Sequence, residues 1–291
     1  MQATVRAPAK INLTLDVAGR RDDGYHLIDS IMQSVSLYDI VTVRSKPAGG
    51  ISLELSDERL PCDTSNTAWK AAEAFSHRTG LILPGLHIRV QKHIPCEAGL
   101  AGGSADAAGV LVALNLLTEA RLDLDALCDI GSEVGSDVPF CVMGGAARCT
   151  GVGSILDPLP AMPPCWLVIA RPPCGVSTAE AYRRLDRCAI PRRPHTSVMA
   201  DALCGGDLDT IGREVCNVFE PVMDLPEVAE IRGRMRSHNS MGSAMTGSGS
   251  AVFGIFDDRV NAQRCAEELR EQLDCVYLCR PVADGPVPEN G

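Results

Sequence analysis

A glycine-rich segment near the middle of the chain has the composition of a phosphate-binding loop. It reads, in order, Pro95, Cys96, Glu97, Ala98, Gly99, Leu100, Ala101, Gly102, Gly103 and Ser104, and an alanine-rich segment follows from Ala105. Glycines let backbone N–H groups converge on one point, and a helix start adds unpaired N–H groups and the positive end of the helix dipole. The segment therefore predicts an anion site, although a ligand-free strand-to-helix turn would use the same glycines.

Two other phosphate-binding patterns do not occur in the sequence. There is no G-x-x-x-x-G-K-S/T motif, and the G-x-G pairs at Gly151/Gly153 and Gly247/Gly249 lack the third glycine of a dinucleotide fingerprint. A P-loop protein and a dinucleotide-dependent oxidoreductase are therefore both disfavoured.

Two short segments carry side chains suited to proton and phosphoryl transfer. Lys10 and Asn12 alternate along a predicted strand, so both lie on the same face. Asp137 lies between Gly-Ser and Val-Pro-Phe, where burial can tune a carboxylate as a general base. Each has an ordinary alternative: an exposed strand lysine that discourages aggregation, and an Asp that caps a helix or forms an Asx turn.

Two further segments have residues typical of ligand contacts. In the predicted turn from Arg20 to His26, Tyr25 can stack on a planar base and His26 can hydrogen-bond its edge, unless the turn is simply a surface loop. Met245 to Ala251 is a small-residue loop at which a backbone and a phosphate can approach closely, and a plain flexible turn is equally compatible.

The spacing of apolar residues predicts a mixed α+β chain. In the first half, strands are expected at 11–17, 40–44, 51–55 and 86–90, with helices at 66–77, 105–117 and 124–134. In the second half, strands are expected at 166–170, 251–256 and 276–280, with helices at 178–185, 208–219, 228–237 and 260–273. The strands up to residue 55 are expected to form an antiparallel sheet. Prolines from 158 to 164 predict a boundary between domains 1–158 and 159–291, and the tail at 283–291 is expected to be disordered.

The composition disfavours several classes of protein. A formal net charge of -10 over 291 residues argues against a nucleic-acid surface. We find no apolar window approaching the roughly 20 residues of a membrane span and no signal peptide. The thirteen cysteines are scattered, which indicates reduced thiols and not a metal-thiolate site. These features predict a cytoplasmic protein without nucleic-acid or membrane partners, and they leave open whether it is a monomer or a homodimer.

Three of these motifs, in this order, resemble the GHMP kinases: Ala9-Lys10-Ile11-Asn12-Leu13, Gly99-Leu100-Ala101-Gly102-Gly103-Ser104 and Thr246-Gly247-Ser248-Gly249. The resemblance spans nearly the whole chain. It implies a two-domain fold, with an N-terminal domain like the second domain of ribosomal protein S5 and a ferredoxin-like C-terminal domain. It also implies ATP-dependent phosphorylation of an alcohol, with ATP and Mg²⁺ in a cleft between the domains.

The Gly24-Tyr25-His26 turn is similar to that of family members whose alcohol carries a cytidine diphosphate group. The implied reaction phosphorylates the 2-hydroxyl of a cytidine diphosphate-linked methylerythritol, in non-mevalonate isoprenoid synthesis. Asp137 would be the base and Lys10 would stabilise it. The implied substrate contacts are Asn12, Tyr25, His26, Asp137, Ser177, Thr178, Gly247 and Ser248. The implied nucleotide contacts are Lys92 and the residues from Pro95 to Ala105. The metal ligands stay unknown, although the resemblance implies that Ser104 lies near the Mg²⁺ or the β-phosphate.

Alternatives remain at this point. A related kinase for homoserine or a mevalonate-like alcohol would share most motifs but not the Tyr25-His26 turn. A non-catalytic relative that binds a ligand would not need both Lys10 and Asp137.

Overall fold

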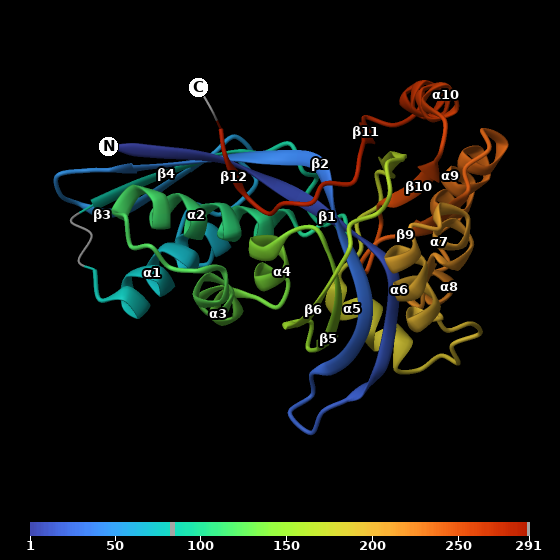
Figure 1. Cartoon of the computed structure of the whole chain (residues 1–291), viewed down its shortest axis with the longest axis horizontal. Helices are drawn as coiled ribbons and strands as arrows, with labels where there is room; N and C mark the ends of the chain where they lie inside the picture. Colours follow the sequence, from blue (N-terminus) through green and yellow to red (C-terminus); the bar gives the residue numbers. More distant parts are fainter. Residues whose placement is uncertain (82–84, 290–291) are drawn as a thin grey trace.

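The computed structural model describes residues 1–81 and 85–289. The described residues form two β-sheets, one in each half of the molecule, with helices packed against both (Figure 1). The larger sheet has the order β12-β1-β2-β4-β3, with β5, β6 and β8 joined beside it. Its strands are β1 (Gln2–Arg20), β2 (His26–Ser45), β3 (Gly50–Leu55), β4 (Gly85–Gln91), β5 (Ala146–Gly151), β6 (Ile155–Leu159), β8 (Cys216–Asn217) and β12 (Val287–Pro288). No helix in the described ranges is long and apolar enough to cross a membrane.

The long hairpin of β1 and β2 is the backbone of the larger sheet. It runs antiparallel from Gln2 opposite Arg44 to Arg20 opposite His26, and β4 adds antiparallel to β2. The strand at 51–55 was expected to pair antiparallel. It joins the sheet as β3, but it pairs parallel with β4. A helix connects β3 to β4, and a crossover of this length is what parallel neighbours require.

Helices α1 to α4 cover one face of the larger sheet (Figure 1). They are α1 (Thr67–Thr79), α2 (Gly102–Thr118), α3 (Leu124–Val134) and α4 (Val138–Met143). At Gly109 of α2, an added Cβ would lie 2.7 Å from a methyl group of Val41, so glycine lets the helix lie directly on β2. Helix α4 was not predicted, because Gly-Ser-Asp followed by proline is also typical of a turn; Pro139 fits here because it lies in the first helical turn.

The smaller sheet has the order β11-β7-β10-β9. Its strands are β7 (Trp166–Arg171), β9 (Gly242–Met245), β10 (Val252–Phe256) and β11 (Cys275–Cys279), and the helices of this half are α5 (Thr178–Leu185), α6 (Thr196–Gly205), α7 (Leu208–Glu214), α8 (Phe219–Met223), α9 (Pro226–Ser237) and α10 (Arg259–Arg270). Strand β7 alternates between two cores: Leu167 and Ile169 join the core of the larger sheet, whereas Val168 and Ala170 pack with α9 and α10. This alternation fastens the two halves together.

Several expected boundaries in the second half are wrong. The helix expected at 208–219 ends at Glu214, and β8 and α8 follow it, because Asn217 turns to hydrogen-bond the backbone of the 245–247 loop. Neither α6 nor β9 was predicted. Both depend on contacts across the fold more than on a clear local pattern.

The C-terminal tail is ordered up to residue 289, which contradicts the expected disorder. Strand β12 pairs with Val5 and Arg6 of β1, and the N–H of Val282 donates to the carbonyl oxygen of Ser34 over 3.0 Å. Gly285 packs against the backbone of Val142, where any side chain would collide. The chain thus returns to the larger sheet after completing the smaller one, and the division into domains 1–158 and 159–291 stays a prediction.

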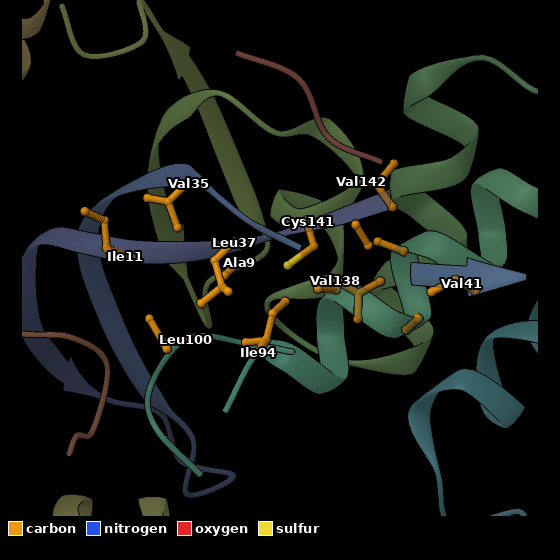
Figure 2. Close-up of a cluster of buried hydrophobic side chains, with 14 of the residues drawn as sticks. Ala9, Ile11, Val35, Leu37, Val41, Ile94, Leu100, Val138, Cys141 and Val142 are labelled. Atoms are coloured by element: carbon orange, nitrogen blue, oxygen red, sulfur yellow. The ribbon is translucent and has the colours of Figure 1, made fainter. Parts of the chain in front are cut away.

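A cluster of apolar side chains fixes the segments that carry the polar motifs (Figure 2). Ala9 and Ile11 from β1 meet Leu100 from the glycine-rich segment and Val138 from α4, and all four side chains are buried. Because strand residues alternate in direction, Lys10 and Asn12 face away from this cluster. Burial of one set of side chains therefore sets the direction of the other.

Candidate active site

A cleft of about 1090 Å³ lies between the two halves of the molecule. Nearly every residue predicted for the site lines it: Lys10, Asn12, Tyr25, His26, Lys92, the run from Pro95 to Ser104, Asp137, Ser177, Thr178, Gly247 and Ser248. Ala105 does not, because its side chain is buried in the core of the larger sheet. Segments far apart in sequence thus converge on one volume.

The start of α2 presents backbone N–H groups at the cleft. The helix begins at Gly102, after Ala101 in a left-handed conformation, and its first intrahelical bond runs from the N–H of Ala105 to the carbonyl of Ala101. Within the described chain, no side chain caps this end. The N–H groups of Gly102, Gly103 and Ser104 therefore have the arrangement and the dipole that suit an anion.

Two glycines let the loops of the two halves pack backbone against backbone. Gly99 has a φ of +75°, and a side chain there would collide with the carbonyl oxygen of Thr246. An added Cβ at Gly247 would in turn lie 2.7 Å from the Cα of Gly99. The Thr246 hydroxyl donates to the carbonyl of Gly99 over 3.2 Å. The glycines at 99 and 247 are thus required by the packing itself, whatever else they contact.

Lys10, Asn12 and Asp137 form a polar group at the cleft wall. The Lys10 ammonium donates to the amide oxygen of Asn12 over 2.7 Å and lies 3.7 Å from a carboxylate oxygen of Asp137. The same amide oxygen accepts from the N–H of Gly247 at 3.0 Å, which holds it in place. The Lys10 side chain is only 4% exposed, whereas that of Asp137 is 31% exposed and can reach a bound molecule.

Lys92 borders the cleft, but its ammonium is held by two buried carboxylates. The nitrogen donates to Asp39 at 2.5 Å and to Asp106 of α2 at 2.6 Å. Burial raises the pKa of Asp106 above the usual range of a carboxyl group, against the effect of the nearby ammonium. Lys92 therefore anchors α2 to the larger sheet.

The other side of the cleft carries aromatic side chains. Tyr25 is 64% exposed at the hairpin tip, whereas His26 stacks on Tyr182 of α5 with ring centres 4.4 Å apart. Burial raises the pKa of Tyr182 to about 12, so its hydroxyl stays neutral. Tyr182 was missed from sequence, although it lies one helical turn after Thr178 and so on the same face of a helix that was predicted.

The remaining predicted contacts come from the second half. The Thr178 hydroxyl lies 3.0 Å from the hydroxyl of Ser248, which joins α5 to the 246–249 loop, and Ser177 precedes α5. Two buried residues organise this loop, Thr246, which belongs to a motif that the sequence singled out, and Asn217, which was missed. The Asn217 amide donates to the carbonyls of Met245 and Gly247, at 2.7 and 2.8 Å.

A metal ion has few protein ligands available here. Within residues 1–81 and 85–289, no group of three or more His, Cys, Asp or Glu side chains is arranged to hold one. Two cleft carboxylates lie beside lysines, Asp137 3.7 Å from Lys10 and Asp106 2.6 Å from Lys92 through Oδ2, and the buried Oδ1 of Asp106 has no hydrogen-bond partner among the described residues.

Comparisons with known proteins agree with this geometry. The GHMP kinases N-terminal domain matches residues 66–145 and the GHMP kinases C-terminal domain matches residues 199–275. Two relatives named 4-diphosphocytidyl-2-C-methyl-D-erythritol kinase come from Caldicellulosiruptor saccharolyticus and Alkaliphilus metalliredigens. The first is 43% identical, covering 94% of this chain and 95% of the relative, and the second is 42% identical, covering 92% of each.

Solved structures support the same assignment. A crystal structure of 4-(cytidine 5'-diphospho)-2C-methyl-D-erythritol kinase matches with a TM-score of 0.79 and 35% identity, covering 97% of this chain and 99% of that one. A homoserine kinase from Cytophaga hutchinsonii also matches with a TM-score of 0.79, but at 20% identity over 99% and 97% it shows the fold alone. The predicted two-domain GHMP kinase fold is confirmed. The chain belongs to the GHMP kinase family, and within it to the group of the 4-diphosphocytidyl-2-C-methyl-D-erythritol kinases.

Proposed function

We propose that the chain transfers the γ-phosphoryl group of ATP to the 2-hydroxyl of 4-(cytidine 5'-diphospho)-2-C-methyl-D-erythritol. The products are the 2-phosphate and ADP, in non-mevalonate isoprenoid synthesis. The observation that carries the proposal is a single cleft that holds an anion-binding helix start, a lysine-carboxylate pair and an aromatic wall. These three parts match a phosphate donor, a hydroxyl acceptor and a nucleobase.

Asp137 is suited to take the proton of the acceptor hydroxyl. The hydroxyl oxygen attacks the γ-phosphorus, the bond to the leaving oxygen of ADP breaks, and the proton moves to the carboxylate. Lys10 is 3.7 Å from that carboxylate and stabilises its ionised form as well as the charge on the phosphoryl group. Asn12 holds the ammonium in place from the other side.

The phosphate end of the cleft, residues 95–104, supplies backbone N–H groups to ATP. The uncapped first turn of α2 provides donors and a positive dipole end, which together favour negative charge. Lys92 acts here by holding α2 in position, since its ammonium is already shared by Asp39 and Asp106. Glu97 is exposed, and one of its carboxylate oxygens lies near Gly175. Because a carboxylate repels phosphate, we assign the Glu97 side chain no contact with ATP.

Mg²⁺ fits this site as an ion held mainly by the nucleotide. Mg²⁺ is commonly bound by substrate phosphates, water and one or two protein oxygens, and the described residues contain no larger group of His, Cys, Asp or Glu side chains arranged for a metal. The half-buried Ser104 in the first turn of α2 is the side chain that would contribute an oxygen. When bound, the ion neutralises phosphate charge.

The base end of the cleft, formed by Tyr25, His26 and Tyr182, is suited to cytosine. An exposed ring and a stacked pair of rings offer flat surfaces for a pyrimidine. Homoserine and mevalonate carry no nucleobase, so a second base-binding wall, apart from the ATP site, favours the cytidine substrate.

The thirteen cysteines, all within the described ranges and all free thiols, support the proposal of a reducing cytoplasmic location. Whether the chain acts as a monomer or a homodimer stays a proposal.

A substrate panel tests the function directly. ADP release is measured with ATP, Mg²⁺ and one of three acceptors: the cytidine diphosphate-linked methylerythritol, homoserine or mevalonate. We expect turnover with the first alone. Turnover with an acceptor that lacks cytidine, and none with the first, would keep the kinase and reject the substrate.

A further inference from the structure

Asp186 contacts the base end of the cleft from outside. It follows α5 directly, and one of its carboxylate oxygens lies 2.7 Å from Nε2 of His26, a residue 160 positions earlier in the chain. Its other oxygen lies 3.6 Å from the guanidinium of Arg20. Asp186 does not itself line the cleft within the described chain. Its carboxylate therefore joins the end of α5 to both ends of the hairpin turn that carries Tyr25.

The contact continues into a row of rings. His26 stacks on Tyr182, with ring planes 23° apart, and Tyr182 meets Phe219 edge to face with ring centres 4.9 Å apart. His26, Tyr182 and Phe219 all line the cleft. The His26 side chain is 11% exposed, so its ring has little freedom once the carboxylate and Tyr182 hold two sides of it.

The carboxylate also determines which imidazole nitrogen carries the hydrogen. An ionised carboxylate only accepts hydrogen bonds, so Nε2 must donate to it. In the neutral ring, Nδ1 is then the acceptor nitrogen, since the hydrogen bond made by one nitrogen sets the state of the other. With Nδ1 of His26 fixed as an acceptor, the wall favours a base that presents a hydrogen-bond donor over one that does not.

We propose that Asp186 is a positioning residue for the base end: it fixes the orientation and tautomer of His26, and through the stack with Tyr182 it fixes the wall that receives cytosine. The inference rests on the proposed function for the identity of the base. Asp186 acts through His26 and is not among the described residues that line the cleft, so its removal is expected to act on binding of the cytidine substrate and not on phosphoryl transfer.

The test compares Asp186→Ala and Asp186→Asn with a matched control on the same helix. Glu180→Gln removes the same charge from α5, where Glu180 pairs with Arg183 and Arg184 of its own helix. In Asp186→Ala we expect the KM for the cytidine substrate to rise about tenfold, the usual size for a lost hydrogen bond to a charged group. The kcat and the KM for ATP should stay near the wild-type values. Asp186→Asn keeps an acceptor oxygen for Nε2, so its KM for the cytidine substrate should rise less than that of Asp186→Ala. Glu180→Gln should have the wild-type KM.

A second readout needs no substrate. Nitrogen NMR of histidine side chains distinguishes the two tautomers, and His26→Gln identifies the signal to be followed. We expect the Nε2–H form in wild type and a mixture in Asp186→Ala. An unchanged tautomer together with an unchanged KM would overturn the proposal, as would a fall of kcat with the KM for the cytidine substrate unchanged. If wild type does not turn over the cytidine substrate, the proposed function fails, and the tautomer measurement still decides whether Asp186 positions His26.

Discussion

The phosphate end of the cleft presents backbone N–H groups to a ligand, whereas the base end presents side chains. Residues 95–104 are held by the packing of Gly99 on the 246–247 loop and by α2, which Lys92 anchors. Tyr25 is mostly exposed, and His26 depends on a half-exposed carboxylate. The contacts that shape the proposed phosphate site therefore also hold the fold together, whereas the exposed Tyr25 at the base end contributes little to the fold.

Lys92→Met should give the largest loss of stability, because it leaves Asp39 and Asp106 buried without their cation. We expect the free energy of unfolding to fall by about 3–5 kcal/mol, measured by urea denaturation. Lys70→Met, on the exposed face of α1, is the control and should change it by less than about 0.5 kcal/mol. Equal stability of the two variants would show that the buried ion pairs do not hold α2.

Gly99→Ala should lower both stability and binding, since the loop has to move away from Thr246. Alanine at position 99 would have a strained positive φ, and its Cβ would collide with the carbonyl oxygen of Thr246. We expect a loss of about 1–3 kcal/mol by the same denaturation method, with higher KM values for ATP and for the acceptor. Gly19→Ala has open space around it and is the control. A stable Gly99→Ala variant with altered KM only would remove the distinction between the two ends.

Tyr25→Ala should have the opposite profile. The ring is 64% exposed, so the unfolding free energy should hardly change. The KM for the cytidine substrate should rise by about threefold to tenfold, as expected for a lost aromatic stack, with the KM for ATP unchanged. Steady-state kinetics measure both values. Tyr25→Phe retains the ring and should resemble wild type; a loss as large as that of Tyr25→Ala would point to the hydroxyl group instead.

The smallest expected effect is a dependence of stability on pH. It comes from Asp106 of α2, at the phosphate end of the cleft. Because burial raises the folded-state pKa of Asp106, the folded protein binds this proton more tightly than the unfolded chain. The resulting stabilisation is present at acidic pH and is lost as pH rises through the raised pKa. Denaturation midpoints between mildly acidic and mildly alkaline pH should show this decline in wild type and a weaker one in Asp106→Asn. A decline that is unchanged in Asp106→Asn would assign it to other groups.

Local patterns were enough to predict the glycine-rich segment and the helix after it, and to select Lys10 and Asp137 as candidates, whereas their placement at one site came from the family resemblance. Periodicity and glycine content express local backbone preferences, and these survive in the fold. The family resemblance added the substrate, which no pattern of residues could have provided.

What escaped prediction depends on partners far away in sequence. Asn217 matters because it meets the loop at 245–247 from another part of the chain, and Asp186 because it meets His26. The tail at 283–289 is polar and rich in Gly and Pro, which locally indicates disorder, yet β12 and Gly285 pack on the larger sheet. The contact of Lys92 with the nucleotide stays a prediction, and its two carboxylate partners, Asp39 and Asp106, cannot be recognised from sequence spacing.

The most direct test of the proposed reaction compares wild type with Asp137→Asn in an assay of ADP release, using ATP, Mg²⁺ and 4-(cytidine 5'-diphospho)-2-C-methyl-D-erythritol. The variant keeps the size of the side chain but cannot accept the hydroxyl proton. We expect wild-type turnover and a fall in kcat of about 10²- to 10⁴-fold in the variant, with both KM values little changed. A variant with wild-type kcat would contradict the assignment of Asp137 as the base, and absence of wild-type turnover would contradict the proposed reaction.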